Sequence, residues 1–306
     1  MTRDEIKNLP ASVRQRLTNL ADHSGEPFQR VLVNYGLERL LYRLSRSRHH
    51  DRFVLKGALL FAVWSDLPHR PTVDVDLMST TTIATAELVS IFKAICATKV
   101  DDDGLAFPPG SVRGEEIRET RAYAGVRLKL LAKLGNARVD LQVDIGFADA
   151  ITPGPMLLEY PSLLGFPAAQ LSAYPRETVV AEKLEAAVSL GMQNTRMKDF
   201  YDLWVMARNF DFDGEVLSSA IRNTFDRRRT ELPARRPVAL PDEFVADRTK
   251  KMQWAGFLAK SGLPHAILSE AAVSIEMFLA PPTLAAAKGR VFRGKWPPMG
   301  PWREKK

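Results

Sequence analysis

The stretch FVLKGALLFAVWSDLPHRPTVDVDLM, residues 53–78, decides how the chain is interpreted. Its order indicates an apolar strand ending at residues 56–58, a short helix, a turn bounded by prolines, and a strand that carries Asp74 and Asp76. Side chains two residues apart on a strand point to the same face, so these two carboxylates lie together. Like charges repel at close range, and partly buried pairs are rarely left without a cation. The pattern predicts a divalent metal site, and the alternative is a solvent-facing strand edge or a helix-capping role.

The composition describes an ordinary globular chain of 306 residues, 45% hydrophobic and 26% charged, which excludes general disorder. The formal net charge of +7 is compatible with a nucleic-acid or nucleotide partner. The single Cys96 excludes an intramolecular disulfide and favours a reducing cytoplasm. The charged N-terminus resembles no secretory signal, and no apolar run is long enough to span a membrane. We therefore expect a soluble cytoplasmic protein with no membrane partner.

The hydrophobic periodicity divides the chain into three expected parts. Residues 1–50 are predicted to form N-terminal helices that pack on the core, and residues 51–155 a mixed α/β core. Residues 156–306 are predicted to form a mainly helical C-terminal domain, entered through a proline-rich linker whose second half is PSLLGFPAAQLSAYP. The predicted fold class is α+β, with a small mixed sheet.

A second strand supplies candidate partners for the first two aspartates. In ARVDLQVDIGFAD, residues 137–149, Asp140 and Asp144 share the polar face. If the two strands are neighbours, Asp144 adds a third carboxylate, and Asp140 is the competing choice. Gly57 would let the backbone approach a phosphate closely, although a simple packing role is the alternative. We expect the acidic run Asp101–Asp103 to be a solvated turn.

The helical half contains two further segments of interest. Lys183 lies in the predicted helix TVVAEKLEAAVSLG, where a lone lysine is ordinarily a surface residue. In RMKDFYDL, residues 196–203, Lys198, Asp199 and Asp202 have the spacing to share one helix face. The alternative for this second pattern is an ordinary helix surface with ion pairs, which has no functional role.

In their order along the chain, these segments resemble the AbiEii family of nucleotidyltransferase toxins, which includes the MenT toxins of type IV-like toxin–antitoxin systems. The similarity extends over about residues 30–215. The segments that carry it are KGAL at 56–59, RPTVDVDL at 70–77, LQVDIG at 141–146, EKL at 182–184 and RMKDFYDL at 196–203.

The resemblance implies a DNA polymerase β-like nucleotidyltransferase core with a helical C-terminal domain. It implies that Asp74 and Asp76 bind Mg²⁺ or Mn²⁺, that Lys183 holds nucleotide phosphates, and that Asp199 or Asp202 completes the site. The residues expected to line the nucleotide are Lys56, Gly57, Ala58, Thr72, Lys183, Arg196 and Lys198. Ala58 departs from the wider superfamily, which has serine after the glycine, so backbone N–H groups would replace a hydroxyl contact there. The Thr72 hydroxyl is expected to contact a phosphate or to be modified by an antitoxin; the alternative is an ordinary strand residue.

The implied reaction is transfer of a nucleoside monophosphate from an NTP to RNA, with the tRNA 3′ end as the expected acceptor. Such a transfer would block aminoacylation and growth, and a cognate antitoxin would be the protein partner. The alternatives are a catalytically degenerate nucleotide- or RNA-binding module and transfer of the nucleotide to a protein target.

Overall fold

The computed structural model describes residues 8–65, 70–120 and 123–304. The chain forms two compact units. The first contains Met1–Ala148 and Met156–Ala173, and the second contains Asp149–Pro155 and Tyr174–Lys306. This division differs from the expected boundaries because the segment Met156–Ala173 contains strands that join the sheet of the first unit.

The first unit combines helices with a sheet. Its elements in chain order are α1 (Leu9–Ser24), α2 (Phe28–Arg46), η2 (His50–Arg52), β1 (Phe53–Lys56), η3 (Ala58–Leu60), α3 (Phe61–Trp64), β2 (Asp74–Ser79), α4 (Thr85–Cys96), β3 (Leu105–Ala106), η4 (Pro109–Ser111), β4 (Arg113–Thr120), β5 (Tyr123–Leu134), β6 (Ala137–Phe147), β7 (Met156–Tyr160) and β8 (Ala169–Ala173). The elements labelled η are single 3₁₀ turns.

Among the described residues, eight strands form one mixed sheet in the order β3-β5-β6-β2-β1-β8-β7, with β4 also paired to β5. β2 is antiparallel to β1 and parallel to β6, and β5 and β6 form an antiparallel hairpin. The turn of that hairpin is Gly135-Asn136, where the sequence predicts a turn. The predicted α+β class with a mixed sheet is confirmed, and the sheet is larger than predicted.

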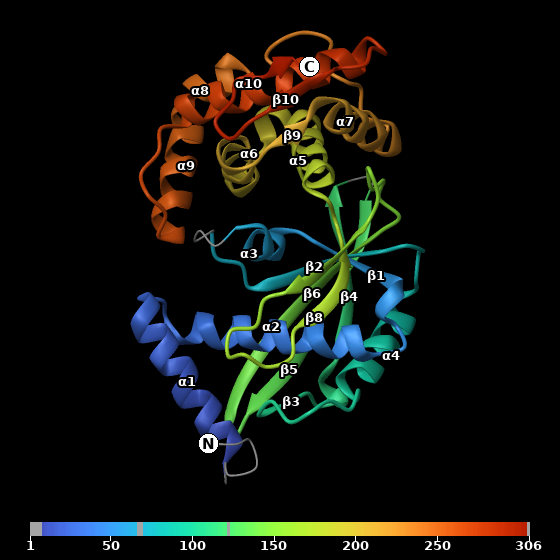
Figure 1. Cartoon of the computed structure of the whole chain (residues 1–306), viewed down its shortest axis with the longest axis vertical. Helices are drawn as coiled ribbons and strands as arrows, with labels where there is room; N and C mark the ends of the chain where they lie inside the picture. Colours follow the sequence, from blue (N-terminus) through green and yellow to red (C-terminus); the bar gives the residue numbers. More distant parts are fainter. Residues whose placement is uncertain (1–7, 66–69, 121–122, 305–306) are drawn as a thin grey trace. The chain divides into compact units, whose positions relative to one another are not determined.

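One face of this sheet is apolar and covered by helices. Val75, Leu77, Val143 and Ile145 lie on this face with at most 1% of their surface exposed. The helix α2 crosses the strands here and contacts β6 and β8 (Figure 1). Phe92 of α4 packs on Phe53 of β1, with ring centroids 5.6 Å apart. Because α2 and α4 cover the apolar face, the polar residues of the same strands gather on the opposite face.

The predicted linker contains two strands, so that prediction was wrong. β8 pairs in parallel with β1 and antiparallel with β7. Ala169, Leu171 and Ala173 alternate with polar residues and are buried. The flanking prolines dominate the sequence signal, and the small buried alanines give the strand a weak hydrophobic pattern.

The second unit is mainly helical, as predicted. Its elements are α5 (Arg176–Leu190), η5 (Gly191–Gln193), α6 (Met197–Asn209), β9 (Phe212–Asp213), α7 (Gly214–Arg228), α8 (Asp242–Ala246), α9 (Arg248–Ser261), α10 (Leu268–Ala287), β10 (Gly294–Trp296) and β11 (Arg303–Glu304). The core lies among α5, α6, α7 and α10. The C-terminal segment closes onto it, since the indole of Trp296 donates to the carbonyl of Ala207 at 2.7 Å. None of the helices described here is both long and apolar enough to cross a membrane.

Candidate functional site

The strand β2 carries the two aspartates that the sequence singles out. Asp74 and Asp76 are half-buried, whereas Val75 and Leu77 are 1% exposed on the covered face. The predicted alternation is therefore confirmed. Thr72 precedes the strand and donates its hydroxyl proton to Oδ1 of Asp74 over 2.6 Å. The hydroxyl fixes this carboxylate, a role that the sequence did not suggest.

The neighbouring strand β6 places Asp144 directly beside Asp76. The parallel register pairs Asp76 with Asp144 and Asp74 with Gln142. Asp140 is exposed, and the hairpin register places it opposite Leu131 of β5. The structure therefore brings Asp144, rather than Asp140, next to the β2 carboxylates. Whether Asp144 acts as a metal ligand stays a prediction.

Arg127 of β5 holds both oxygens of Asp144. Its Nε donates to Oδ1 at 2.8 Å and its Nη2 to Oδ2 at 2.7 Å, a bidentate pair with strong geometric preference. This hydrogen bonding, opposed by partial burial, raises the pKa of Arg127. The sequence reasoning missed Arg127, but a signal exists. Counting eight residues back from Gly135 and eight residues forward from Asn136 leads to Arg127 and Asp144.

Gly57 lies against the carboxylate of Asp76 from the β1 side. Its φ of 78° is one that favours glycine, and a Cβ there would lie 2.7 Å from Cβ and Cγ of Asp76 and collide with Oδ2. Lys56 pairs with Asp76 in the antiparallel register, so the two side chains share a face. Ala58 is 8% exposed and opens η3. The glycine therefore makes room for the carboxylate.

The helix expected after Gly57 is short, as predicted. It consists of η3, which is three residues long, and α3, which is four residues long. A helix of this length sums few peptide dipoles, so the expected anion site at its N-terminus has little support. The feature that still favours a close approach of a phosphate to the backbone is the conformational freedom of Gly57.

A separate cluster of charges lies inside the second unit. Nζ of Lys183 in α5 contacts Oδ1 of Asp199 at 2.7 Å and Oδ2 of Asp202 at 2.8 Å, both in α6. Nε of Arg196 contacts Oδ2 of Asp199 at 2.6 Å. Asp199 and Asp202 are 1% and 0% exposed. The expected surface placement of Lys183 was wrong, because its side chain is 11% exposed and joins two buried carboxylates.

The electrostatics of this cluster favour ionised carboxylates. Burial alone would raise the pKa of Asp199, but Lys183 and Arg196 outweigh burial, and the pKa lies below its ordinary value. Lys198 does not join the buried pairs as the helix spacing suggested, because its side chain is exposed while Asp199 and Asp202 are buried. The helical spacing of Lys198 and Asp202 suggested a pair within one helix, whereas Asp202 contacts Lys183 of a different helix, α5.

The donor set in the first unit fits a hard divalent cation that is shared with a substrate. Within residues 8–65, 70–120 and 123–304, no group of three or more His, Cys, Asp and Glu side chains is arranged to hold a metal ion. Asp74 and Asp76 nevertheless supply two carboxylates on one face, and Mg²⁺ is commonly held by one or two carboxylates plus substrate phosphates. The residues present therefore suit a cation that arrives with its nucleotide.

One protein family and two solved structures resemble this chain. A family model described as "Nucleotidyl transferase AbiEii toxin, Type IV TA system" matches residues 39–274. The search of curated proteins finds no significant match. Two solved structures are similar in outline. The JHP933 protein of Helicobacter pylori is 15% identical with a TM-score of 0.44, and covers 84% of this chain and 91% of its own. A candidate nucleotidyltransferase of H. pylori is 14% identical with a TM-score of 0.43, and covers 83% of this chain and 93% of its own.

Proposed function

We propose a specific reaction from one premise: the chain belongs to the AbiEii family of nucleotidyl transferase toxins. It is thus a nucleotidyltransferase, and the family belongs to Type IV toxin–antitoxin systems. The proposed reaction is Mg²⁺-dependent transfer of a nucleoside monophosphate from an NTP to the 3′ end of an RNA, with tRNA as the acceptor. Transfer to tRNA would stop aminoacylation and growth. The proposed compartment is the cytoplasm, and the proposed protein partner is a cognate antitoxin.

The observation that carries the proposal is the position of Asp76. Gly57 lies against its carboxylate on one side, and Asp144 pairs with it in register on the other. This arrangement supports a catalytic role for Asp76, because phosphoryl transfer depends on metal ions that neutralise phosphate charge and on carboxylates that hold those ions. Asp74, fixed by the Thr72 hydroxyl, completes the pair on β2.

In the proposed step, the acceptor 3′ oxygen forms a bond to the α-phosphorus of the NTP. The bond from that phosphorus to its bridging oxygen breaks, pyrophosphate leaves, and the acceptor proton passes to solvent. Bound divalent metal would neutralise phosphate charge during this displacement. Asp74 and Asp76 would hold that metal, and Asp144, fixed by Arg127, would be the third carboxylate. Lys183 is proposed as a nucleotide phosphate contact and Asp202 or Asp199 as a further site residue.

The test is incorporation of nucleotide labelled at the α-phosphate into purified tRNA, with each NTP in turn and with Mg²⁺. Wild-type protein should label the tRNA, and the Asp74→Ala variant should not. Asp101→Asn, which changes an exposed carboxylate elsewhere in the first unit, is the matched control and should retain activity. Failure to label RNA with any of the four NTPs would contradict the proposal, and label in protein instead would support the alternative acceptor.

Lys183 requires a separate measurement, because its loss also breaks buried ion pairs. If it contacts phosphates, Lys183→Met should raise the KM for NTP in the fraction of protein that remains folded. An unchanged KM would remove Lys183 from the nucleotide site and leave it a structural role.

A further inference from the structure

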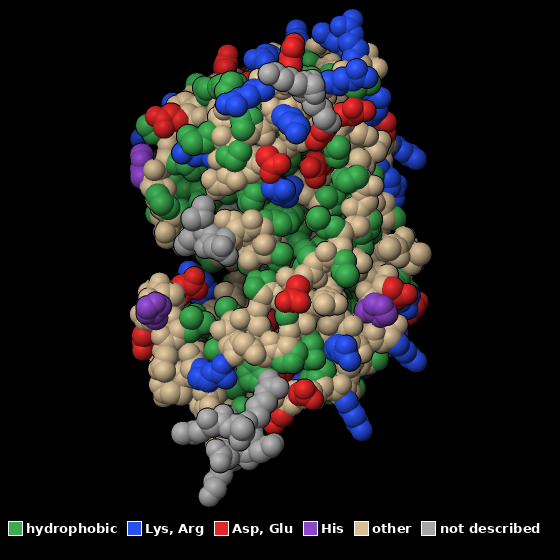
Figure 2. Space-filling view, viewed as in Figure 1, with side chains coloured by type: hydrophobic (Ala, Val, Ile, Leu, Met, Phe, Trp, Pro, Cys, Tyr) green, Lys and Arg blue, Asp and Glu red, His purple; other side chains and the backbone are tan. Residues whose placement is uncertain are grey.

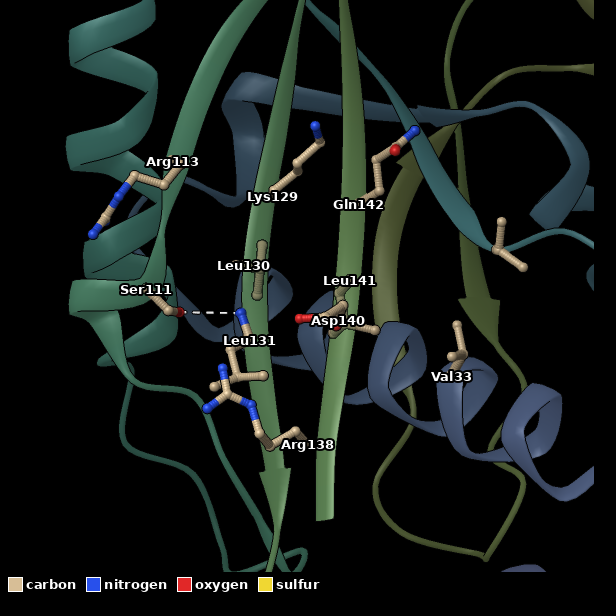
Figure 3. Close-up of a pocket in the computed structure, with 11 residues that line it drawn as sticks. Val33, Ser111, Arg113, Lys129, Leu130, Leu131, Arg138, Asp140, Leu141 and Gln142 are labelled. Carbon is tan, nitrogen blue, oxygen red and sulfur yellow. Dashed lines mark hydrogen bonds between the residues drawn. The ribbon is translucent and has the colours of Figure 1, made fainter. Parts of the chain in front are cut away.

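A pocket of about 610 Å³ lies in the first unit beside the β2 carboxylates. Residues of β4, β5 and β6 line most of it, and Ser111 of η4, Val33 of α2 and Val73 complete the lining (Figure 3). Figure 3 shows Lys129 and Gln142 on neighbouring strands, with Asp140 and Arg138 farther along β6. The pocket has no role in the reaction described above.

The strand registers place this pocket in line with the carboxylates. One cross-strand row consists of Lys56, Asp76, Asp144, Arg127 and Glu115. The adjacent row on the same face consists of Asp74, Gln142, Lys129 and Arg113. Successive rows on one face are two residues apart, or about 6.6–6.8 Å. The pocket therefore begins one row from Asp76 and Asp144.

Farther along the same face, the next rows lead to Arg138. Asp140 pairs with Leu131, and Arg138 pairs with Lys133. Basic residues thus occur at two levels of the face, beginning beside the carboxylates and continuing away from them.

The described lining of the pocket is basic on balance. Arg113, Lys129 and Arg138 are exposed, and Asp140 is the one acidic residue of the described lining. Nη1 of Arg113 donates to the carbonyls of Gly110 and Val112 at 2.7 and 2.9 Å. Nζ of Lys129 lies 2.8 Å from Oε1 of Glu115, but both side chains are more than half exposed, at 60% and 51%. Exposed ion pairs contribute little, so a phosphate can replace Glu115 at Lys129. The apolar Leu131 at the base of the pocket offers a surface for a sugar or base.

This basic character is local and does not simply reflect the net charge. On the face of the molecule shown in Figure 2, blue, red and green side chains are intermixed over both units. The positive charge is therefore not gathered there into one broad patch. The pocket takes its charge from the particular residues that the β-sheet register brings together.

The topology also determines from which side each substrate would come. β1, which ends at Gly57, flanks β2 on one side, and β6 flanks it on the other. In phosphoryl transfer, the leaving group and the attacking oxygen lie on opposite sides of the phosphorus. If the NTP phosphates are held beside Gly57, the acceptor must approach from the β6 side, where the pocket lies.

We propose that this pocket binds the phosphodiester backbone of the acceptor RNA strand, with Arg113, Lys129 and Arg138 contacting phosphates upstream of the reacting 3′ end. The proposal rests on the proposed function, because it takes the acceptor to be RNA. It adds the surface that holds that RNA and the residues that contact it. Asp140 lowers the affinity of this surface.

The experiment measures binding of 5′-labelled deacylated tRNA to full-length protein at several salt concentrations. The variant Lys129→Glu/Arg138→Glu should weaken binding about tenfold or more and reduce the dependence of log K on log salt. The KM for NTP should stay unchanged. Asp140→Asn should act in the opposite direction and strengthen tRNA binding. Its retained transfer activity would also exclude Asp140 as a metal ligand.

The matched control is Lys93→Glu. Lys93 is exposed on α4, whose Phe92 packs on the opposite, apolar face of the sheet, so this reversal should leave tRNA affinity unchanged. A milder variant, Lys129→Gln/Arg138→Gln, keeps the test valid if the double charge reversal fails to fold.

The possible outcomes separate this inference from the proposed function. If the wild type labels tRNA and the charge reversals leave its affinity unchanged, the inference is overturned and the function stands. If they raise the KM for NTP and spare tRNA binding, the pocket serves the nucleotide and the inference is again overturned. If the wild type neither binds nor labels tRNA, both fail.

Discussion

Two regions of the molecule contain acidic residues close to basic ones, yet they differ in burial and in charge balance. In the first unit, Asp74 and Asp76 are half-buried on a polar sheet face. In the second unit, Asp199 and Asp202 are almost completely buried and contact Lys183 at 2.7 and 2.8 Å. The first arrangement leaves its carboxylates partly accessible to solvent, whereas the second encloses its charges inside the protein.

This difference separates two explanations for a pattern of acidic and basic residues in the sequence. A half-exposed carboxylate pair contributes little to folding and gains stabilisation when a cation binds. A buried ion-pair cluster is required for folding, because each removed partner leaves a charge without compensation. Substitution in the first region should therefore act mainly on activity, whereas substitution in the second should lower stability, in addition to any effect through the proposed nucleotide contact of Lys183.

The largest effect is expected for Asp76→Asn in the first unit. Loss of one carboxylate should reduce nucleotide transfer at least about a thousandfold, or about 4 kcal/mol of transition-state stabilisation. The free energy of unfolding should change by less than about 1 kcal/mol, since the side chain is half-buried. Transfer kinetics and urea denaturation measure the two quantities. If Asp76→Asn instead lowered the free energy of unfolding and its folded fraction kept full activity, the comparison between the two units would be reversed.

Asp202→Ala tests the second unit. It leaves Lys183 without one of its two buried partners, so the free energy of unfolding should fall by about 3–5 kcal/mol. The control is Asp211→Ala, whose carboxylate is 82% exposed and lies 3.7 Å from Arg176. That change should cost less than about 0.5 kcal/mol. If Asp202→Ala and Asp211→Ala lowered the free energy of unfolding equally in urea denaturation, burial would not decide how much each carboxylate contributes to stability.

Gly57→Ala returns to the first unit with a smaller effect. The new Cβ would displace the Asp76 carboxylate and would occupy a backbone conformation unfavourable for alanine. Transfer activity should fall about 10- to 100-fold, or about 1.4–2.7 kcal/mol. Gly110→Ala is the matched control, because a Cβ there meets open space. Activity equal to that of the control would show that the carboxylate can move without consequence.

The smallest effect is a pH dependence of stability in the second unit. Because the folded state lowers the pKa of Asp199, the resulting stabilisation is fully present above the unfolded carboxyl pKa of about 4. It should be lost as the pH falls through the lower folded value. Thermal unfolding of wild type and Asp199→Asn from pH 6 to pH 3 measures it. The variant should show a weaker pH dependence, and parallel curves would contradict the assignment.

The sequence predicts the local parts of this molecule well. The alternation around Asp74 and Asp76 predicts their common face, and the Gly135-Asn136 turn predicts the hairpin that carries Asp144. These features depend on side-chain period and turn chemistry, which lie within a few neighbouring residues. The membership in a known family follows from the order of such segments along the chain.

Contacts between distant segments were not predictable in the same way. The expected solvated turn Asp101–Asp103 was wrong for Asp103, which is 1% exposed and contacts Arg39 and Arg43 of α2. Lys183 was expected on the surface for the same reason, since its partners lie on a different helix. A charge pattern along one helix or strand gives no information about which residues of another helix or strand will contact it. Burial then changes a solvated charge into a structural ion pair.

The return of the chain to the first unit has a consequence for its synthesis. β1 ends beside Gly57, yet its second neighbour, β8, comes only after the chain has contributed residues 149–155 to the other unit. Since translation proceeds from the N-terminus, the nascent chain carries an open edge on β1 until residues 169–173 have emerged. More than half of the 306 residues must therefore leave the ribosome before the sheet that supports Asp76 is complete.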